Sequence, residues 1–350
     1  MMLGDLSSGR DNNFNLIRFC AAFAVLVSHS FALAVGTPDA EPLYTTYGLT
    51  WGDIAVDVFF VTSGFLVTAS LLNRRSAVAF VKARVLRIFP ALWIMLAISV
   101  FGVGLAFTTW DAHAYLGAGA TWRYLLKNAL LFRGIEYRLP GLFQSNPASL
   151  KVNGSLWTLK PEVQMYVLLL ALWLPLRKFL PYAVAGVAAV AGIVYLVHRN
   201  FSDELFEFPR LAFMFFTGAS AYAFRDRIPL SRSAFGGLLC VAVLSALNRA
   251  AFFFALSLTL PYLLLYAAYT FKGFILSFNR LGDYSYGIYI YAFLVQQTIA
   301  HMVPGISIAA LMASSAAVTL TLAVLSWHLV EKQALALKSW RLARRAAVPA

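Results

Sequence analysis

Two ionisable side chains lie inside the first apolar stretch of the sequence. Arg18 and His29 interrupt the run NLIRFCAAFAVLVSHS, which otherwise consists mainly of apolar residues. Ionisable groups inside a bilayer are costly unless they are paired or hydrated, so they mark functional sites. Arginine is a good phosphate ligand, and histidine is the usual general base near neutral pH. These residue types predict a site that holds an anion and removes a proton.

The spacing of Arg18 and His29 places both on one helical face. They are 11 residues apart, which is about 20° past three full turns and about 16 Å along the axis. An extended anionic thioester such as acyl-CoA would fit this geometry, with phosphates at Arg18 and the acyl group near His29. Taken singly, each residue also fits a plainer role, as a snorkelling arginine or a histidine hydrogen-bonded to a neighbouring helix.

The second apolar run, GDIAVDVFFVTSGFLV, carries two carboxylates near its start. Asp53 and Asp57 are four residues apart, hence on one helical face, at roughly the depth of His29. We expect Asp57 to orient His29 or the acceptor substrate. Ser63 and Gly64 lie deeper and form a small-residue surface that a ligand, or simply another helix, can approach closely.

Two further arginines lie three residues apart in VKARVLRIFP. Arg84 and Arg87 share a face at the cytoplasmic start of the expected third helix. They fit an anchor that keeps positive charge inside the cell, and they fit a phosphate clamp equally well.

Glu162 follows Pro161 in the first turn of the expected fourth helix, where proline is tolerated. The carboxylate could orient or help to deprotonate a substrate hydroxyl, or it could simply complement the helix N-terminus. Both interpretations remain open.

The last two runs hold a tyrosine cluster and one acidic residue. The tyrosines are too many for one interfacial belt, so we expect some, Tyr286 among them, to line a cavity. We expect Glu331, at the inner end of the last helix, to pair with Arg18, Arg84 or Arg87. His301 and His328 are expected at the membrane interface.

The composition indicates a membrane protein. Of 350 residues, 61% are hydrophobic and 12% are charged, whereas a soluble domain is about 25% charged; the mean hydropathy is +0.73. The net charge of +13 does not indicate nucleic acid, because the cations lie between apolar runs and no basic, aromatic binding module is visible. Cys20 and Cys240 support neither a disulfide framework nor a metal site.

Ten apolar runs of roughly membrane-spanning length follow one another along the chain. The expected fold is therefore an all-α polytopic bundle of about ten transmembrane helices. The expected organisation is a segment over 1–13, a membrane domain over 14–332 and a basic tail over 333–350. The runs cover 14–35, 52–72, 87–108, 161–176, 181–198, 208–224, 234–250, 251–270, 283–303 and 307–330.

Basic residues are concentrated in every second segment that connects the apolar runs. The 73–87 loop holds five, and the tail after 331 is also basic, whereas the 36–51 and 304–306 segments hold none. Positive charge stays on the cytoplasmic side, so both termini are expected there, and Arg199 and Arg210 are expected on the outer side. The 109–160 segment lies outside and is the only one large enough to form a lid or an acceptor surface.

Six sequence elements in order resemble the membrane-bound acyltransferase family 3, which includes bacterial O-antigen and exopolysaccharide O-acetylases. The resemblance extends from Asn15 to Glu331. The elements are Arg18 with His29, Phe59 to Phe65 after Asp57, Arg84 with Arg87 before Pro90, Ser155 to Leu159 with Glu162 and Tyr166, Gly282 with Ser285, Tyr286 and Tyr289, and Glu331-Lys332.

The resemblance implies transfer of an acyl group, most often acetyl, from cytoplasmic acyl-CoA to a carbohydrate hydroxyl at a multi-pass inner-membrane enzyme. The partners would be acyl-CoA, a lipid-linked or exported glycan and membrane lipid, with no tightly bound cofactor, metal or nucleic acid. It implies catalytic roles for His29, Glu162 and Asp57, and donor binding by Arg18, Arg84, Arg87, Ser63, Tyr286 and Glu331.

This chain departs from the family pattern at a few positions. Ala292 stands where many members have a histidine, Val163 where many have a second glutamate, and Lys160-Pro161 is unusual. Two other classes remain open: a transporter or flippase, which would also use polar groups inside a bundle, and an inactive, sensor-like relative.

Overall fold

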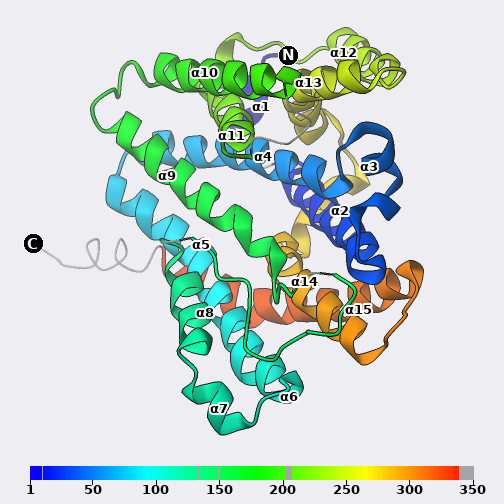
Figure 1. Cartoon of the computed structure of the whole chain (residues 1–350). Coiled ribbons are helices and arrows are strands. Elements are labelled where there is room, and N and C mark those ends of the chain that lie inside the picture. The colour runs from blue at the N-terminus through cyan, green and yellow to red at the C-terminus, as the bar shows by residue number, and fades with distance from the viewer. Residues whose placement is uncertain (10, 133, 149, 202–206, 339–350) are drawn as a thin grey trace, which may run out of the picture. The chain divides into compact units, whose positions relative to one another are not determined.

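The computed structural model describes residues 1–350 apart from 10, 133, 149, 202–206 and 339–350 (Figure 1). Within this part the chain is all-helical, and its one extended pairing is an isolated bridge between Met2 and Pro229. The expected all-α class is confirmed, whereas the expected ten spans and cytoplasmic termini stay predictions. Each of the ten apolar runs coincides with one of the helices α2 (Phe14–Val35), α4 (Trp51–Arg74), α5 (Ala77–Ala97), α9 (Leu159–Trp173), α10 (Leu180–Phe201), α11 (Glu207–Ala223), α12 (Arg232–Ser245), α13 (Arg249–Thr270), α14 (Ser285–Met302) and α15 (Ile308–Ser326).

Six helical stretches are long and apolar enough to cross a membrane, judged by length and composition over the described residues. They cover residues 14–35, 51–74, 77–107, 180–198, 249–270 and 308–336. The helix α12 is apolar but has 14 residues, and α9 and α11 have 15 and 17. The structure thus supports a membrane protein with several spans. Six described stretches meet the length and hydropathy expected of a single crossing, which is fewer than the ten apolar runs in the sequence.

The chain divides into two compact units. The first unit comprises Met1–Val25, Glu41–Asn73 and Pro161–Asp283. In it, α10 packs along α11 and α12 packs along α13, as the green and yellow helices of Figure 1 show. Its core includes the rings of Phe14, Phe65 and Tyr269. The remaining short helices of this unit are α1 (Leu3–Ser7), α3 (Pro42–Tyr47), η4 (Arg225–Arg227) and η5 (Phe274–Arg280).

The N-terminal segment is an ordered part of the first unit. Leu3 is fully buried, its N–H donates to Ile228 O at 2.9 Å, and the N–H of Leu230 donates to Met1 O at 2.8 Å. The buried amide of Asn13 donates to Ala267 O and Phe271 O. The N-terminal segment therefore lies on the same side of this unit as the segment around Ile228 and the C-terminal end of α13.

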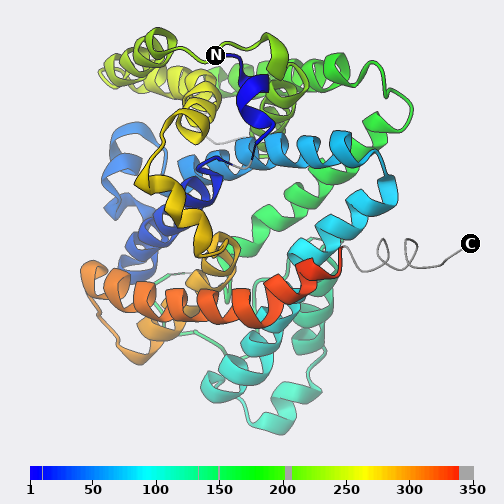
Figure 2. The ribbon, with the colours of Figure 1, turned by 180° about the vertical axis from the view of Figure 1, so that it is seen from behind.

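The second unit comprises Leu26–Ala40, Arg74–Lys160 and Tyr284–Ala350. The helix α5 continues through a π-helical segment (Ile98–Gly104) into α6 (Leu105–Phe107). In the same way α15 continues through a second π-helical segment, η6 (Trp327–Glu331), into α16 (Lys332–Ala336), the red helix of Figure 2. The helix α14 packs along α15. The other elements are η1 (Pro38–Ala40), α7 (Ala112–Gly117), α8 (Gly119–Leu130) and η3 (Gly154–Thr158).

The expected loop over 73–87 is wrong. The helix α4 ends at Arg74 and α5 begins at Ala77, so only two residues separate them. Ser76 caps α5 by accepting a hydrogen bond from the N–H of Ala79, a typical N-cap contact. Arg84 and Arg87 therefore lie two to three turns inside the helix. Hydropathy missed this start because α5 opens with an amphipathic stretch whose basic residues lower the average.

The 109–160 segment contains the two short helices α7 and α8, of which α8 packs on α5 and α7 packs on α8. Tyr115 of α7 is buried and donates its hydroxyl hydrogen to Val100 O at 3.1 Å. The side chain of Asn128 in α8 bonds the backbone of Glu136 in both directions. This segment is thus anchored at several points to the second unit.

Candidate active site

Arg18 and His29 lie on one continuous helix, α2, as their spacing predicts. Arg18 belongs to the first unit, where its guanidinium lies 5.7 Å from the centre of the Phe59 ring. The Nε atom of Arg18 is buried and has no hydrogen-bond partner among the described residues. His29 belongs to the second unit, where its ring meets that of Phe293 edge-on at 5.0 Å. Both side chains are partly buried.

The turn of α2 that carries His29 is held by α14. Gln296 is fully buried, and its Nε2 donates to Leu26 O at 2.8 Å and to Ser30 Oγ at 2.7 Å. These bonds restrain the backbone three residues before His29 and the side chain of the residue directly after it. Sequence reasoning missed Gln296; its signal is a pair of amides, Gln296-Gln297, inside an apolar run.

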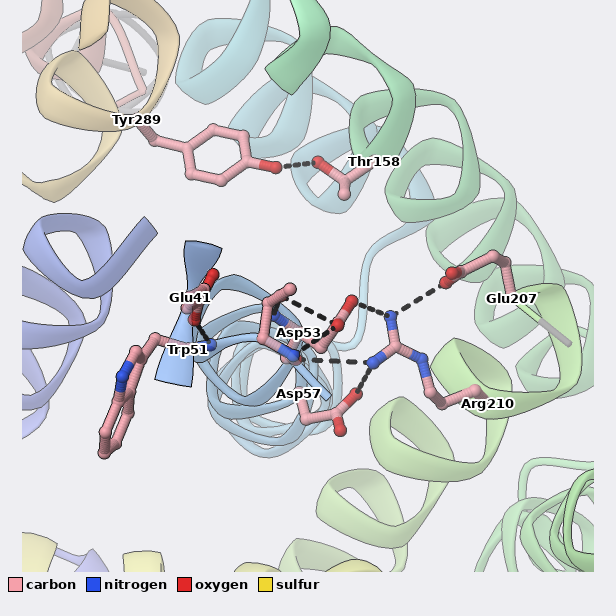
Figure 3. Close-up of polar contacts among 9 residues, drawn as sticks. Glu41, Trp51, Asp53, Asp57, Thr158, Glu207, Arg210 and Tyr289 are labelled. Atoms are coloured by element: carbon pink, nitrogen blue, oxygen red, sulfur yellow. Dashed lines mark hydrogen bonds and ion pairs between the residues drawn. The ribbon is translucent and has the colours of Figure 1, made fainter. Parts of the chain in front are cut away.

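Asp53 and Asp57 surround a buried arginine in the first unit (Figure 3). Arg210 of α11 is 0% exposed, and its Nη1 lies 3.4 Å from Asp57 Oδ1. Its Nη2 lies 3.6 Å from Asp53 Oδ1 and 2.8 Å from Glu207 Oε2. The expected position of Arg210 in a connecting loop is wrong, because Arg210 lies inside α11, where three carboxylates stabilise its charge.

The sequence held a signal for this cluster. Two carboxylates one turn apart in an apolar helix require a compensating cation, and Arg210 is the arginine inside the apolar run 208–224. The count of charges in the connecting segments placed it in a loop because it lies near the start of that run. Which helix supplies the cation depends on tertiary packing.

Gly64 faces α11 rather than an open surface. A Cβ added to Gly64 would lie 1.8 Å from Phe215 O, and one added to Gly218 would lie 2.1 Å from Val61 O. The two helix backbones therefore touch at these glycines, which is the helix-packing alternative for Gly64. Ser63 is 5% exposed and lies beside this contact.

Arg87 and Glu331 form a buried ion pair in the second unit. Arg87 Nη1 lies 3.3 Å from Glu331 Oε2, and Ser326 donates its hydroxyl hydrogen to Glu331 Oε1 at 3.0 Å. The Arg87 guanidinium also lies 5.5 Å from the centre of the Tyr286 ring, and Tyr286 donates to Ile88 O. The predicted pairing of Glu331 with one of the arginines is thus met by Arg87.

More positive charge lies near Arg87 than Glu331 can neutralise. Burial, together with Arg84, Arg87 and Arg74, lowers the pKa of Lys338 to about 8. Lys82 donates to Leu337 O, which ties the residue before Lys338 to α5. A set of cations that lie close enough to repel one another is suited to bind a multiply charged anion.

Glu162 lies in the first turn of α9, as predicted, and accepts a hydrogen bond from the hydroxyl of Tyr166. In the second unit, Thr158 Oγ1 and the Tyr289 hydroxyl are 2.6 Å apart (Figure 3), and the Asn153 amide donates to Ile290 O at 2.8 Å. These bonds fix η3 to α14. Tyr286, Tyr289 and Tyr291 are all buried.

His301 and His328 contact aromatic and polar side chains of the second unit. His301 is partly buried between the rings of Phe107 and Phe143, and its Nδ1 is 3.2 Å from Asn146 Oδ1. His328 is exposed and contacts Tyr284. Within the described residues, no group of three or more His, Cys, Asp or Glu side chains could hold a metal ion.

The structure thus divides the predicted site residues into two sets. Arg18, Asp57, Ser63 and Glu162 lie in the first unit, and His29, Arg84, Arg87, Tyr286 and Glu331 lie in the second. The second set combines a base with a strongly basic region, which together could support transfer from an anionic donor.

Comparison with known proteins agrees with this chemistry. A family model described as "Acyltransferase domain" matches residues 11–328. Nodulation protein 10 of Rhizobium leguminosarum bv. viciae is 31% identical over 380 residues, which cover 98% of each chain. An O-acetyl transferase of Shigella phage Sf6 is 29% identical over 343 residues, which cover 95% of this chain and 98% of the relative. No solved structure matches significantly.

The family match spans nearly the whole chain, and both relatives are covered almost end to end. The predicted resemblance and the predicted enzyme class are confirmed. The chain belongs to acyltransferase family 3 and is an acyltransferase.

Proposed function

We propose that the protein transfers an acetyl group from cytoplasmic acetyl-CoA to a hydroxyl of an exported or cell-surface carbohydrate. The printed name of the phage relative, O-acetyl transferase, supports the acetyl group and the oxygen acceptor. The observation that carries the proposal is a candidate base on a membrane-length helix. His29 is partly buried, and its helical turn is restrained by Gln296.

The reaction needs a base at the acceptor oxygen. The hydroxyl oxygen attacks the thioester carbonyl carbon, the new C–O bond forms, and the C–S bond breaks. His29 takes the hydroxyl proton and returns it to the departing CoA thiolate, so the products are an acetyl ester and CoA thiol. An acyl-histidine intermediate would use the same residue as a nucleophile.

The basic region of the second unit is suited to hold the CoA phosphates. Arg84 and Arg87 supply charge, Glu331 and Tyr286 fix the direction of Arg87, and Lys338 adds a further cation. We assign Arg18, with its free buried Nε, and Ser63 to donor binding in the first unit. Acetyl-CoA acts as a co-substrate and not as a resident cofactor.

Glu162 and Asp57 are assigned to orienting the acceptor or His29. The Tyr166 hydroxyl holds the carboxylate of Glu162, and Arg210 holds that of Asp57. Carboxylates held in this way keep a fixed direction toward a bound hydroxyl.

The topology proposed for this function has ten transmembrane helices within 14–332, with the segment 1–13 and the tail 333–350 in the cytoplasm. The enzyme would lie in the inner membrane, its donor region inside and the 109–160 segment outside. The Asn13 amide donates hydrogen bonds to Ala267 O and Phe271 O. These bonds support a position of the N-terminus and the 271–283 loop on the same side of the membrane.

Thiol release from acetyl-CoA tests the proposed function. Purified protein in lipid nanodiscs should release CoA thiol when an extract of the host's lipid-linked and exported glycans is added, and label from acetyl-CoA should appear in the glycan. Label in phospholipid instead of glycan would reject the carbohydrate acceptor. Movement of a glycan across the membrane without thiol release would support a transporter.

A further inference from the structure

Gln296 contacts the same turn of α2 that carries His29. Its Nε2 donates to Leu26 O and Ser30 Oγ, at 2.8 and 2.7 Å. Because a backbone carbonyl only accepts hydrogen bonds, the contact with Leu26 fixes which end of the amide is nitrogen. The oxygen, Oε1, is therefore the atom directed elsewhere.

The same face of α14 also touches His29 directly. Phe293 precedes Gln296 by three residues, so the two side chains share a helical face. The Phe293 ring meets the His29 ring at 5.0 Å. The two contacts place the Gln296 amide beside the proposed base, within one unit of the structure.

Oε1 of Gln296 lacks a partner. The atom is buried, and no donor bonds to it in the described part of the chain. Nearly all buried polar atoms in proteins are satisfied, because leaving an acceptor unsatisfied is costly. A buried acceptor beside a catalytic base is explained if a substrate supplies the missing donor.

The neighbouring glutamine shows the contrast. Gln297 is also fully buried, and its amide is satisfied at both ends. Its Nε2 donates to Lys151 O at 2.7 Å, and its Oε1 accepts from Asn146 Nδ2 at 2.6 Å. Gln297 therefore anchors the 146–151 loop, whereas Gln296 retains an unused acceptor.

We propose that Gln296 Oε1 accepts a hydrogen bond from a hydroxyl of the acceptor that is adjacent to the hydroxyl deprotonated by His29. This inference rests on the proposed function and deepens it. It gives the acceptor a chemical class, a polyol with neighbouring hydroxyls, because one hydroxyl cannot donate its single hydrogen to both His29 and Gln296.

The test compares Gln296→Met with the matched control Gln297→Met. Both are measured in nanodiscs as label transferred from acetyl-CoA into the host glycan extract, at varied extract and varied acetyl-CoA. Gln296→Met should raise the extract concentration needed for half-maximal rate by about tenfold or more. Its KM for acetyl-CoA should stay unchanged, and Gln297→Met should change neither value by more than about twofold. Equal behaviour of the two variants would overturn the proposal, as would an effect of Gln296→Met on the KM for acetyl-CoA alone.

Two further variants separate substrate binding from the restraint of α2. Ser30→Ala removes one bond of the restraint and leaves Oε1 in place, so the half-maximal extract concentration should stay near that of the wild type. Gln296→Glu retains an acceptor oxygen in nearly the same shape but loses the N–H that donates to Leu26 O and Ser30 Oγ, so its half-maximal extract concentration should lie closer to that of the wild type than that of Gln296→Met does. Loss of acceptor affinity in both variants would show a structural role only. If His29→Ala transfers label normally, the proposed function fails instead, whatever Gln296 does.

Discussion

Among single residues, Arg210 meets the largest number of opposite charges in the first unit. Three carboxylates lie within 3.6 Å of its guanidinium, and the side chain is 0% exposed. Removing one partner of a buried ion pair costs more than the pair itself contributes, because the other charge stays buried. Asp57 therefore depends on Arg210 for its orientation and its charge.

Arg210→Met should destabilise the protein by about 3–5 kcal/mol, seen as a large drop in the unfolding temperature of the purified protein in detergent. Adding Asp57→Asn should recover part of the loss by removing the unpaired charge. Arg225→Gln is the control, since the side chains of the Arg225–Asp226 pair, 3.9 Å apart, are 30% and 75% exposed, and solvent-accessible pairs contribute about 0–1 kcal/mol. Equal shifts in Arg210→Met and Arg225→Gln would contradict the buried cluster.

Lys338 gives the basic region of the second unit a dependence on pH. Its pKa of about 8 means that it is charged below that pH and becomes neutral as pH rises through it. A bound anion favours the charged form and raises the pKa, so CoA affinity should be full below pH 8 and fall by about tenfold toward pH 10. Lys338→Arg should remove this fall, measured as CoA binding by calorimetry. An unchanged fall in the variant would exclude Lys338 from donor binding.

The residues of the candidate site could be predicted from the sequence to different degrees. Arg18, His29, Arg84 and Arg87 stand out in the sequence because charge is rare in apolar helices. Gln296 and Arg210 gain their importance from partners more than 150 residues away, and spacing along the chain cannot reveal such partners.

At the scale of helices, the contact between α4 and α11 depends on two glycines. A side chain at Gly64 or Gly218 would run into the backbone of the other helix. Overpacking of this kind costs about 1–3 kcal/mol or more, so Gly64→Ala should lower the unfolding temperature and the yield of folded protein. Gly237→Ala in α12, where nothing lies within 4 Å, should be neutral or slightly stabilising. A harmless Gly64→Ala would contradict this packing.

Helix positions were largely predictable, whereas several helix ends were not. The run 14–35 coincides with α2, and Asn248 caps α13 at the predicted break in the 234–270 stretch. The start of α5 and the two π-helical segments escaped prediction, because hydropathy averages over a window and does not sense local hydrogen bonding.

At the scale of the whole molecule, the even number of spans and the cytoplasmic termini remain to be tested. Six stretches among the described residues satisfy the length and hydropathy of a span. The four helices α9, α11, α12 and α14 must cross as well if there are ten. Reporter fusions that fluoresce only in the cytoplasm should be bright after residue 338 and within 225–231, and dark within 304–306. A bright signal at 304–306 would contradict the ten-span topology.

The central claim is that His29 performs the acyl transfer and that Arg18 serves the donor. The most direct measurement is glycan-dependent CoA thiol release by wild type, His29→Ala and Arg18→Ala in lipid nanodiscs, with CoA binding measured on the same samples. His29→Ala should lose about 10²–10⁴-fold or more in rate and still bind CoA, whereas Arg18→Ala should mainly weaken CoA binding. Release by His29→Ala at the wild-type rate would contradict the account.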